Sequence, residues 1–318
     1  MSNGTQLQIT NNTNYTIKNQ SVVRMAQYYS IEFKLILTKV RTKWSSIIGD
    51  YLRAETGLRL NSSKGRKSSN TQSERIIRYD EKLDRGEVFL RALDEKYADL
   101  DFDEFLANRN LMKEMRASKK YYFEKTDNDL NEHFMQLTKY LEGYLKKYNV
   151  ENIIQDLYKN KDKSLDIWGT YHLNDSHIEL YIIPLVLFSK LFPINLEYAL
   201  LTTLVHEMAH AYHHIGKDSD GKIWNHFNTA DDNIVEGLAE YYTWMFVEDY
   251  KYEYPDMKVT YDYMYQCLSG PYIIFQDWIS EKYTKEHVRI ALQATRRSNI
   301  TGYDDFLKSM EDAKKLIK

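Results

Sequence analysis

The scarcity of chain-breaking residues most constrains what this sequence can fold into. Only 12 glycines and 4 prolines occur among 318 residues. Glycine supplies the positive φ of tight turns, and proline interrupts helices because it lacks a backbone N–H. A β-sandwich needs many such turns, so it is disfavoured. The sequence instead predicts long helices, and we expect a mostly α (α+β) protein with a small mixed sheet.

The first half of the chain predicts helices of no assigned role. Residues 1–20 are rich in Asn, Thr and Gln and are expected to form a polar arm. Residues 21–160 are expected to be a helical region, interrupted by a polar, basic run at 61–73 that predicts a mobile, solvated loop. Apolar residues recur at helical spacing over 21–60, and further helices are expected over 74–97, 102–124 and 128–148.

The pattern changes at the start of the second half, residues 161–318. Residues 166–173 and 176–183 alternate as strands do, with Asn174-Asp175 as the turn between them. A helix is then expected from an Asn195 cap through Ile215, with Gly216 as its end. Another helix is expected from Asp231 or Asp232 to about residue 249.

The first of these helices carries the segment His206-Glu207-Met208-Ala209-His210. Residues four apart share one face of a helix, so both imidazoles can reach one point. Neutral histidine nitrogens are common zinc ligands, and a catalytic zinc keeps three protein ligands and a water. Glu207 would take a proton from that water as a general base and hand it to the leaving amine. We therefore predict one zinc ion per chain.

The second helix supplies acids at the same spacing, Glu236 and Glu240, within the largely apolar segment 234–242. Buried carboxylates need a metal or a hydrogen-bonding partner. Glu236 is the expected third zinc ligand. Glu240 is expected to orient a ligating histidine through its other ring nitrogen.

The HEMAH segment followed by EGLAE resembles the gluzincin group of zinc metallopeptidases, over roughly residues 168–242. The resemblance implies a zincin-like catalytic domain over 161–318, in which an edge strand before the active-site helix binds the substrate as an added strand. That edge would be residues 169–171 or 178–182. The metzincin pattern is excluded, because it needs Gly at position 213 and His at position 216, where this chain has His213 and Gly216.

A looser similarity to SprT/Spartan-type proteases leaves a second possibility for the third ligand. In that pattern a histidine after a Gly-containing loop binds the metal, which would be His226, although its flanking residues are Asn225 and Phe227. His213 and His214 are expected at the cleft edge or exposed, and His172 and His177, which flank the strand turn, are expected on the surface.

Zincins also need a donor that stabilises the oxyanion. The candidates follow the third-ligand helix, and Tyr272, just after the Gly270-Pro271 break, is the predicted one among Tyr261, Tyr263, Tyr265 and Tyr272.

The composition limits which partners and which cellular location are expected. The net charge of −3 gives no sign of an obligatory nucleic-acid or membrane partner. The one cysteine, Cys267, excludes an intrachain disulfide, and the N-terminus has no apolar signal core. A cytoplasmic location is expected, and the oligomeric state is left open.

Together these features predict a zinc metallopeptidase acting on a peptide or protein substrate. Two alternatives stay open: a zinc hydrolase of a non-peptide amide, and a non-catalytic, metal-stabilised interaction protein. An intact Glu207 favours an enzyme, because a structural zinc site has no use for a base.

Overall fold

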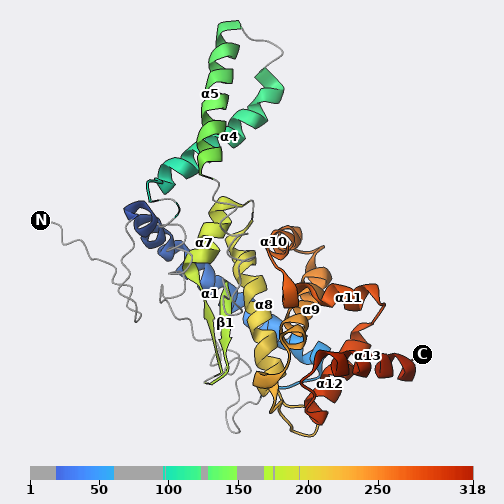
Figure 1. The fold of residues 1–318 in the computed structure, drawn as a ribbon. Helices are drawn as coiled ribbons and strands as arrows, with labels where there is room; N and C mark the ends of the chain where they lie inside the picture. The colour runs from blue at the N-terminus through green and yellow to red at the C-terminus, as the bar shows by residue number, and fades with distance from the viewer. Residues whose placement is uncertain are drawn as a thin grey trace, which may run out of the picture.

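A computed structural model describes residues 19–60, 96, 98–122, 128–148, 168–174, 176–192 and 194–317. In this part the protein is mostly α-helical, as expected, and its sheet is one antiparallel pair of strands rather than a mixed sheet (Figure 1). The predictions for residues 1–18, 61–95, 97, 123–127, 149–167 and 175 lie outside the described residues. None of the helices described has the length and apolar character needed to cross a bilayer.

The helices expected near residues 21–60, 102–124, 128–148, 195–215 and 231–249 are present. The longer ones are α1 (Gln20–Thr56), α4 (Phe102–Tyr122), α5 (Asn128–Lys147), α7 (Ile182–Leu191), α8 (Leu196–Ile215), α9 (Asp232–Tyr250), α10 (Pro255–Tyr265), α12 (Lys285–Ser298) and α13 (Tyr303–Leu316). Short elements join them: η1 (Phe227–Thr229), η2 (Gly270–Ile273) and α11 (Phe275–Ser280).

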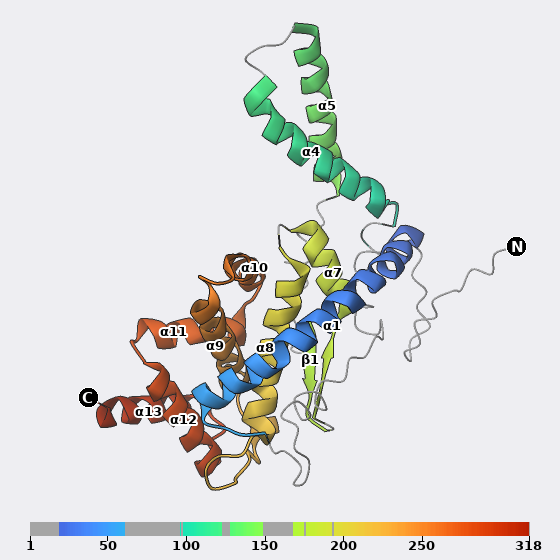
Figure 2. The same ribbon diagram turned by 180° about the vertical axis from the view of Figure 1, so that it is seen from behind.

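Helix α8 lies at the centre of the fold. α1 crosses it on one side and α9 packs along it on another (Figures 1 and 2). The hydroxyl of Tyr212 on α8 donates a hydrogen bond of 2.8 Å to the carbonyl of Gly49 on α1. Trp44 of α1 is fully buried and meets the ring of Phe246 on α9 edge-on. These contacts fix α1, α8 and α9 as one packed unit.

Both ends of α8 are held by side chains. Asn195 caps its start, because its side chain accepts a hydrogen bond from the backbone N–H of Glu197, and Gly216 ends it, as predicted. The buried guanidinium of Arg296, from α12, donates to the carbonyls of His213 and Gly216. The last carbonyls of a helix lack partners within the helix, so this arginine satisfies them. The central turns of α8 are thereby held in place.

The strand pair precedes α8. β1 (Gly169–His172) pairs with β2 (His177–Leu180), and His172 lies opposite His177 next to the turn. The predicted second strand was too long: Ile182 already begins helix α7. Pro184 is the third residue of that helix, where a missing N–H costs no hydrogen bond. The apolar run was therefore the start of a buried helix and not the end of a strand.

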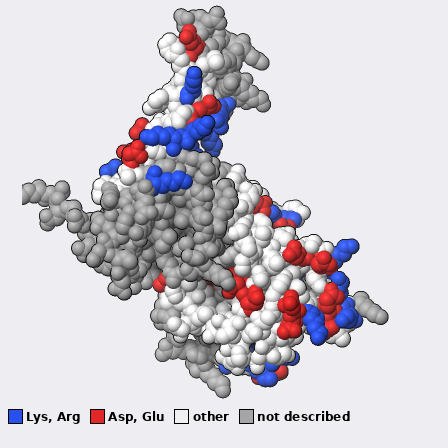
Figure 3. Space-filling model, viewed as in Figure 1, with Lys and Arg blue, Asp and Glu red and all other residues white. Residues whose placement is uncertain are grey.

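Helices α4 and α5 form an arm that projects from the rest of the molecule (Figure 1). Met112, Met115 and Leu141 make its own small apolar cluster. Acidic and basic side chains occur together on the arm and over the C-terminal helices (Figure 3). The arm is connected to the core through contacts between α4 and α1.

Gly237 allows α9 to approach the segment after α10 closely. A Cβ at this position would lie 2.6 Å from Cγ2 of Ile274 and 2.9 Å from a ring carbon of the buried Trp278. We expect Gly237→Ala to lower the free energy of unfolding by about 1–3 kcal/mol, because overpacking outweighs the better helix propensity of alanine. Denaturant titration followed by circular dichroism measures this.

Gly143→Ala is the matched control, since it also lies within a helix but has no atom within 4 Å of the added Cβ. It should raise the free energy of unfolding by about 0.5–1 kcal/mol. Equal effects of the two substitutions would show that the close approach at Gly237 has no energetic weight.

Candidate metal centre

Two neighbouring helices bring the predicted ligands together. His206 and His210 lie one turn apart on α8, and Glu236 lies on the first turns of α9. α9 begins where the sequence predicts, because Asp231 caps it by accepting from the N–H of Asn233. The packing of α8 against α9 then sets these three side chains face to face.

The three donor atoms form a nearly equilateral triangle. Nε2 of His206 lies 3.1 Å from Nε2 of His210, and each of these nitrogens lies 3.2 Å from Oε2 of Glu236. Zinc–ligand bonds of about 2.0–2.1 Å in a tetrahedral site separate neighbouring ligand atoms by about 3.3 Å. The observed edges fit one face of such a tetrahedron, so this donor set suits a zinc ion.

The two carboxylates at the triangle, Glu236 and Glu240, also favour the binding of a cation. In the described part of the chain, the ion pairs of Glu236 and Glu240 are with histidines, not with lysine or arginine. Burial opposes the charge of the Glu236 carboxylate, but the adjacent His210 and His206 outweigh it and lower the pKa. Burial likewise opposes a charge on His206, yet its hydrogen bonds to Glu236 and Glu240 hold its pKa well above the usual value. A metal ion can supply the positive charge that a proton on His206 otherwise provides.

Glu240 holds the other side of His206. Its Oε2 lies 2.9 Å from Nδ1 of His206, and its Oε1 accepts a 2.8 Å hydrogen bond from the hydroxyl of Tyr261. Nδ1–H donation to a carboxylate leaves the Nε2 lone pair free to face Glu236 and His210, and such outer partners strengthen metal binding. The contact expected between Glu240 and a ligating histidine is present. The hydrogen bond from Tyr261 to Glu240 was not predicted, because Tyr261 was considered only as a donor to the oxyanion.

Glu240→Gln should lower zinc affinity by about 10- to 100-fold, because the neutral amide stabilises the oriented imidazole less well. Competition against a chromogenic chelator measures the change. Glu248→Gln, a half-buried glutamate near the end of the same helix that pairs with Lys251 and Lys258, is the control and should bind zinc as the wild type does. Equal zinc affinities in the wild type and both variants would show that Glu240 does not contribute to metal binding.

Glu207 and Tyr272 both lie next to the cluster. Glu207 is buried, with 5% of its surface exposed, and its charge acts on His206. The ring of Tyr272 stacks over that of His206, with centroids 5.8 Å apart and planes inclined by 28°. The ring of Phe227 meets that of His210 edge-on. Phe227 was not among the predicted residues; its only signal was its place beside His226.

Three other histidines, His213, His214 and His226, differ in how deeply they are buried. His226 is exposed and lies outside the cluster formed by His206, His210 and Glu236. His213 was expected at the cleft edge or exposed, but it is fully buried, and burial holds its pKa well below the usual value. His214 is half-buried, and its Nδ1 lies 3.0 Å from the Tyr171 hydroxyl.

His172 and His177 also differ from the prediction. They were expected on the surface, yet both are half-buried and gather around Glu179 on the hairpin.

Comparison of the chain with protein-family models, with curated proteins and with solved structures gave no match.

Proposed function

We propose that this chain is a zinc-dependent metallopeptidase. The observation that supports it best is the triangle of His206, His210 and Glu236 with Glu207 adjacent to it in sequence. Zinc bound to these donors would lower the pKa of a water molecule and polarise a carbonyl group. A purely structural site uses four protein ligands, whereas three leave a position for substrate or water.

Glu207 is the general base of the proposed reaction. It removes a proton from the attacking water and delivers this proton to the nitrogen of the leaving amine as the C–N bond breaks. The buried position of Glu207 protects the proton from exchange with bulk water. His206 keeps its orientation through Glu240 and Tyr261 while the proton moves.

Tyr272 is the proposed donor to the developing oxyanion. Its ring covers one side of His206, which places a phenol at the edge of the metal site. A hydroxyl group aimed at the carbonyl oxygen stabilises the negative charge of the tetrahedral intermediate. Tyr261 is not the proposed oxyanion donor, because its hydroxyl already donates a hydrogen bond to Glu240.

The hairpin before α8 is the proposed substrate-binding edge. Gly169 of β1 is so close to α8 that an added Cβ would lie 2.9 Å from Cγ2 of Thr203, and Tyr171 contacts His214. A peptide added to a strand edge gains backbone hydrogen bonds without a sequence requirement. Of the two segments considered, residues 169–171 lie in β1, and only residues 178–180 of the second lie in a strand, since Ile182 belongs to α7.

Elemental analysis and peptide cleavage test the proposal together. Purified protein should carry about one zinc per chain. After stripping and reloading with zinc, it should cleave a mixed-sequence peptide library at reproducible bonds, as detected by mass spectrometry, and the stripped protein should not. Zinc without cleavage of peptides, but with hydrolysis of small non-peptide amides, would identify the alternative hydrolase. Zinc with neither activity would favour a metal-stabilised interaction protein.

A further inference from the structure

The β1–β2 hairpin carries a second group of metal-ligand side chains, away from α8. His172 and His177 are direct cross-strand partners, and Glu179 follows His177 by two residues on the same strand. Side chains alternate between the faces of a strand, so all three lie on one face. Tyr171 and Ile178 occupy the other face, where Tyr171 contacts His214 of α8. The group is therefore separated from the α8–α9 metal centre by the hairpin itself.

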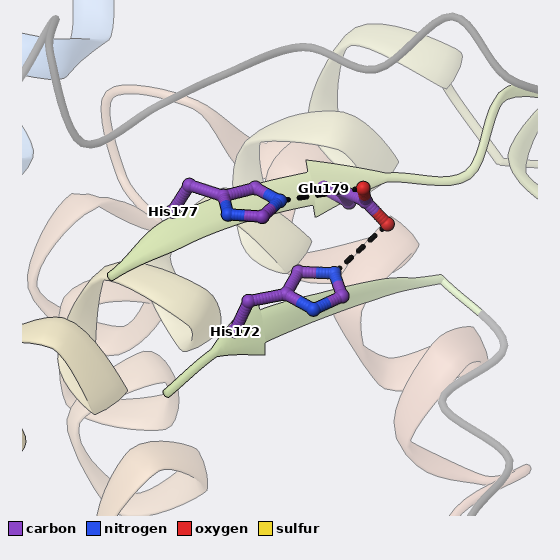
Figure 4. Close-up of side chains that lie close together, drawn as sticks. All are labelled: His172, His177 and Glu179. Atoms are coloured by element: carbon purple, nitrogen blue, oxygen red, sulfur yellow. Dashed lines mark hydrogen bonds and ion pairs between the residues drawn. The ribbon is translucent and has the colours of Figure 1, made fainter. Parts of the chain in front are cut away.

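Glu179 contacts both imidazoles through different oxygens (Figure 4). Its Oε2 lies 2.8 Å from Nε2 of His172, and its Oε1 lies 3.3 Å from Nε2 of His177. The two rings stack with centroids 4.3 Å apart and planes inclined by 12°. The donor atoms of all three residues lie within 4.8 Å of one another.

The short contact between His172 and Glu179 is not a hydrogen bond. Nε2 of His172 is buried and has no hydrogen-bond partner in the described part of the chain, although the carboxylate oxygen is only 2.8 Å away. The nitrogen therefore does not point at the oxygen. Both atoms can instead face a third atom between them, as ligands of one metal ion do.

Hydrogen bonds do not satisfy this group fully. Nε2 of His177 pairs with Glu179, whereas the buried Nε2 of His172 has no hydrogen-bond partner in the described part of the chain. No lysine or arginine of the described residues forms an ion pair with Glu179. The side chains are partly shielded from water, with exposed fractions of 27% for His172, 14% for His177 and 20% for Glu179. One divalent cation would neutralise the carboxylate and use both nitrogen lone pairs.

We propose that His172, His177 and Glu179 form a second metal site, which binds a zinc-type divalent transition-metal ion. Imidazole nitrogens favour zinc, copper and nickel, whereas calcium and magnesium favour oxygen ligands. The two imidazole rings are stacked with nearly parallel planes, so side-chain rotations must accompany metal binding and the affinity is lower than at the α8–α9 centre. The ion links the two strands beside their turn and stabilises the hairpin.

Zinc titration of the metal-stripped full-length chain tests this site. Zinc chloride is added while bound metal is counted by equilibrium dialysis and elemental analysis. The wild type should bind two zinc ions, one tightly and one more weakly. The double variant His172→Asn/His177→Asn should bind one, tightly. His133→Asn, an exposed histidine on α5, is the control and should still bind two.

Separate variants assign the two ions and allow for misfolding. Glu179→Gln changes one functional group and should also lose the weaker ion, with an unchanged circular dichroism spectrum. His206→Asn should lose the tighter ion and keep the weaker one. The second zinc equivalent should raise the thermal midpoint of the wild type but not that of Glu179→Gln. Two bound ions in Glu179→Gln and in the double variant would overturn the hairpin site without affecting the proposed peptidase centre.

Discussion

Glu207→Gln is expected to lower the turnover of zinc-loaded protein by about 10²- to 10⁴-fold, the range that a positioned general base contributes. Glutamine keeps the size of the buried side chain but cannot accept a proton from water at neutral pH. Zinc binding should persist, because Glu207 lies outside the triangle of ligands. Cleavage of the best peptide from the library, followed at saturating concentration, measures the loss in kcat.

The control for this experiment is Glu253→Gln, an exposed glutamate after the end of α9. It should leave kcat unchanged. Zinc content and the circular dichroism spectrum of Glu207→Gln should match those of the wild type, which separates a lost base from a lost fold. Hydrolysis that is unaffected in Glu207→Gln would refute the proposed chemistry even if the metal centre is real.

The helices around the metal centre were predictable because their signals are local. The Asn195 cap, the Gly216 end and the Asp231 cap each depend on residues next to one another in the chain. The alignment of His206 with His210 follows from helix geometry alone. The expected contact between Glu240 and His206 also held, because residues four apart on α9 must share the face that meets α8.

The features that the sequence did not reveal depend on long-range packing. Arg296 reaches α8 from a helix about 80 residues later, and nothing near it in the chain marks it as a cap. The assignment of Ile182 to a strand failed because a short apolar run fits a strand or a buried helix equally well. His172 and His177 were expected on the surface because the predicted turn sets their pairing but not how deeply the packed hairpin buries them.

Glu236→Ala should lower zinc affinity by more than 100-fold. Loss of an outer partner of a metal ligand already costs about 10- to 100-fold, and the loss of one donor among three exceeds it. The variant removes one corner of a triangle of donor atoms that are 3.1 and 3.2 Å apart, so only the two histidines remain as ligands. Competition with a chelator of known affinity, at fixed pH, measures the change for the tighter ion.

His226→Ala decides between the two candidate third ligands. His226 is exposed and lies outside the cluster, so its removal should change zinc affinity less than twofold. Glu236→Gln supports the comparison, because it keeps the side-chain volume and removes the anionic oxygen that zinc prefers. If instead His226→Ala releases the metal while Glu236→Ala retains it, the loop after α8 must fold onto the two histidines in solution. The site would then follow the SprT/Spartan-type pattern, with Glu236 as a neighbouring acid rather than a ligand.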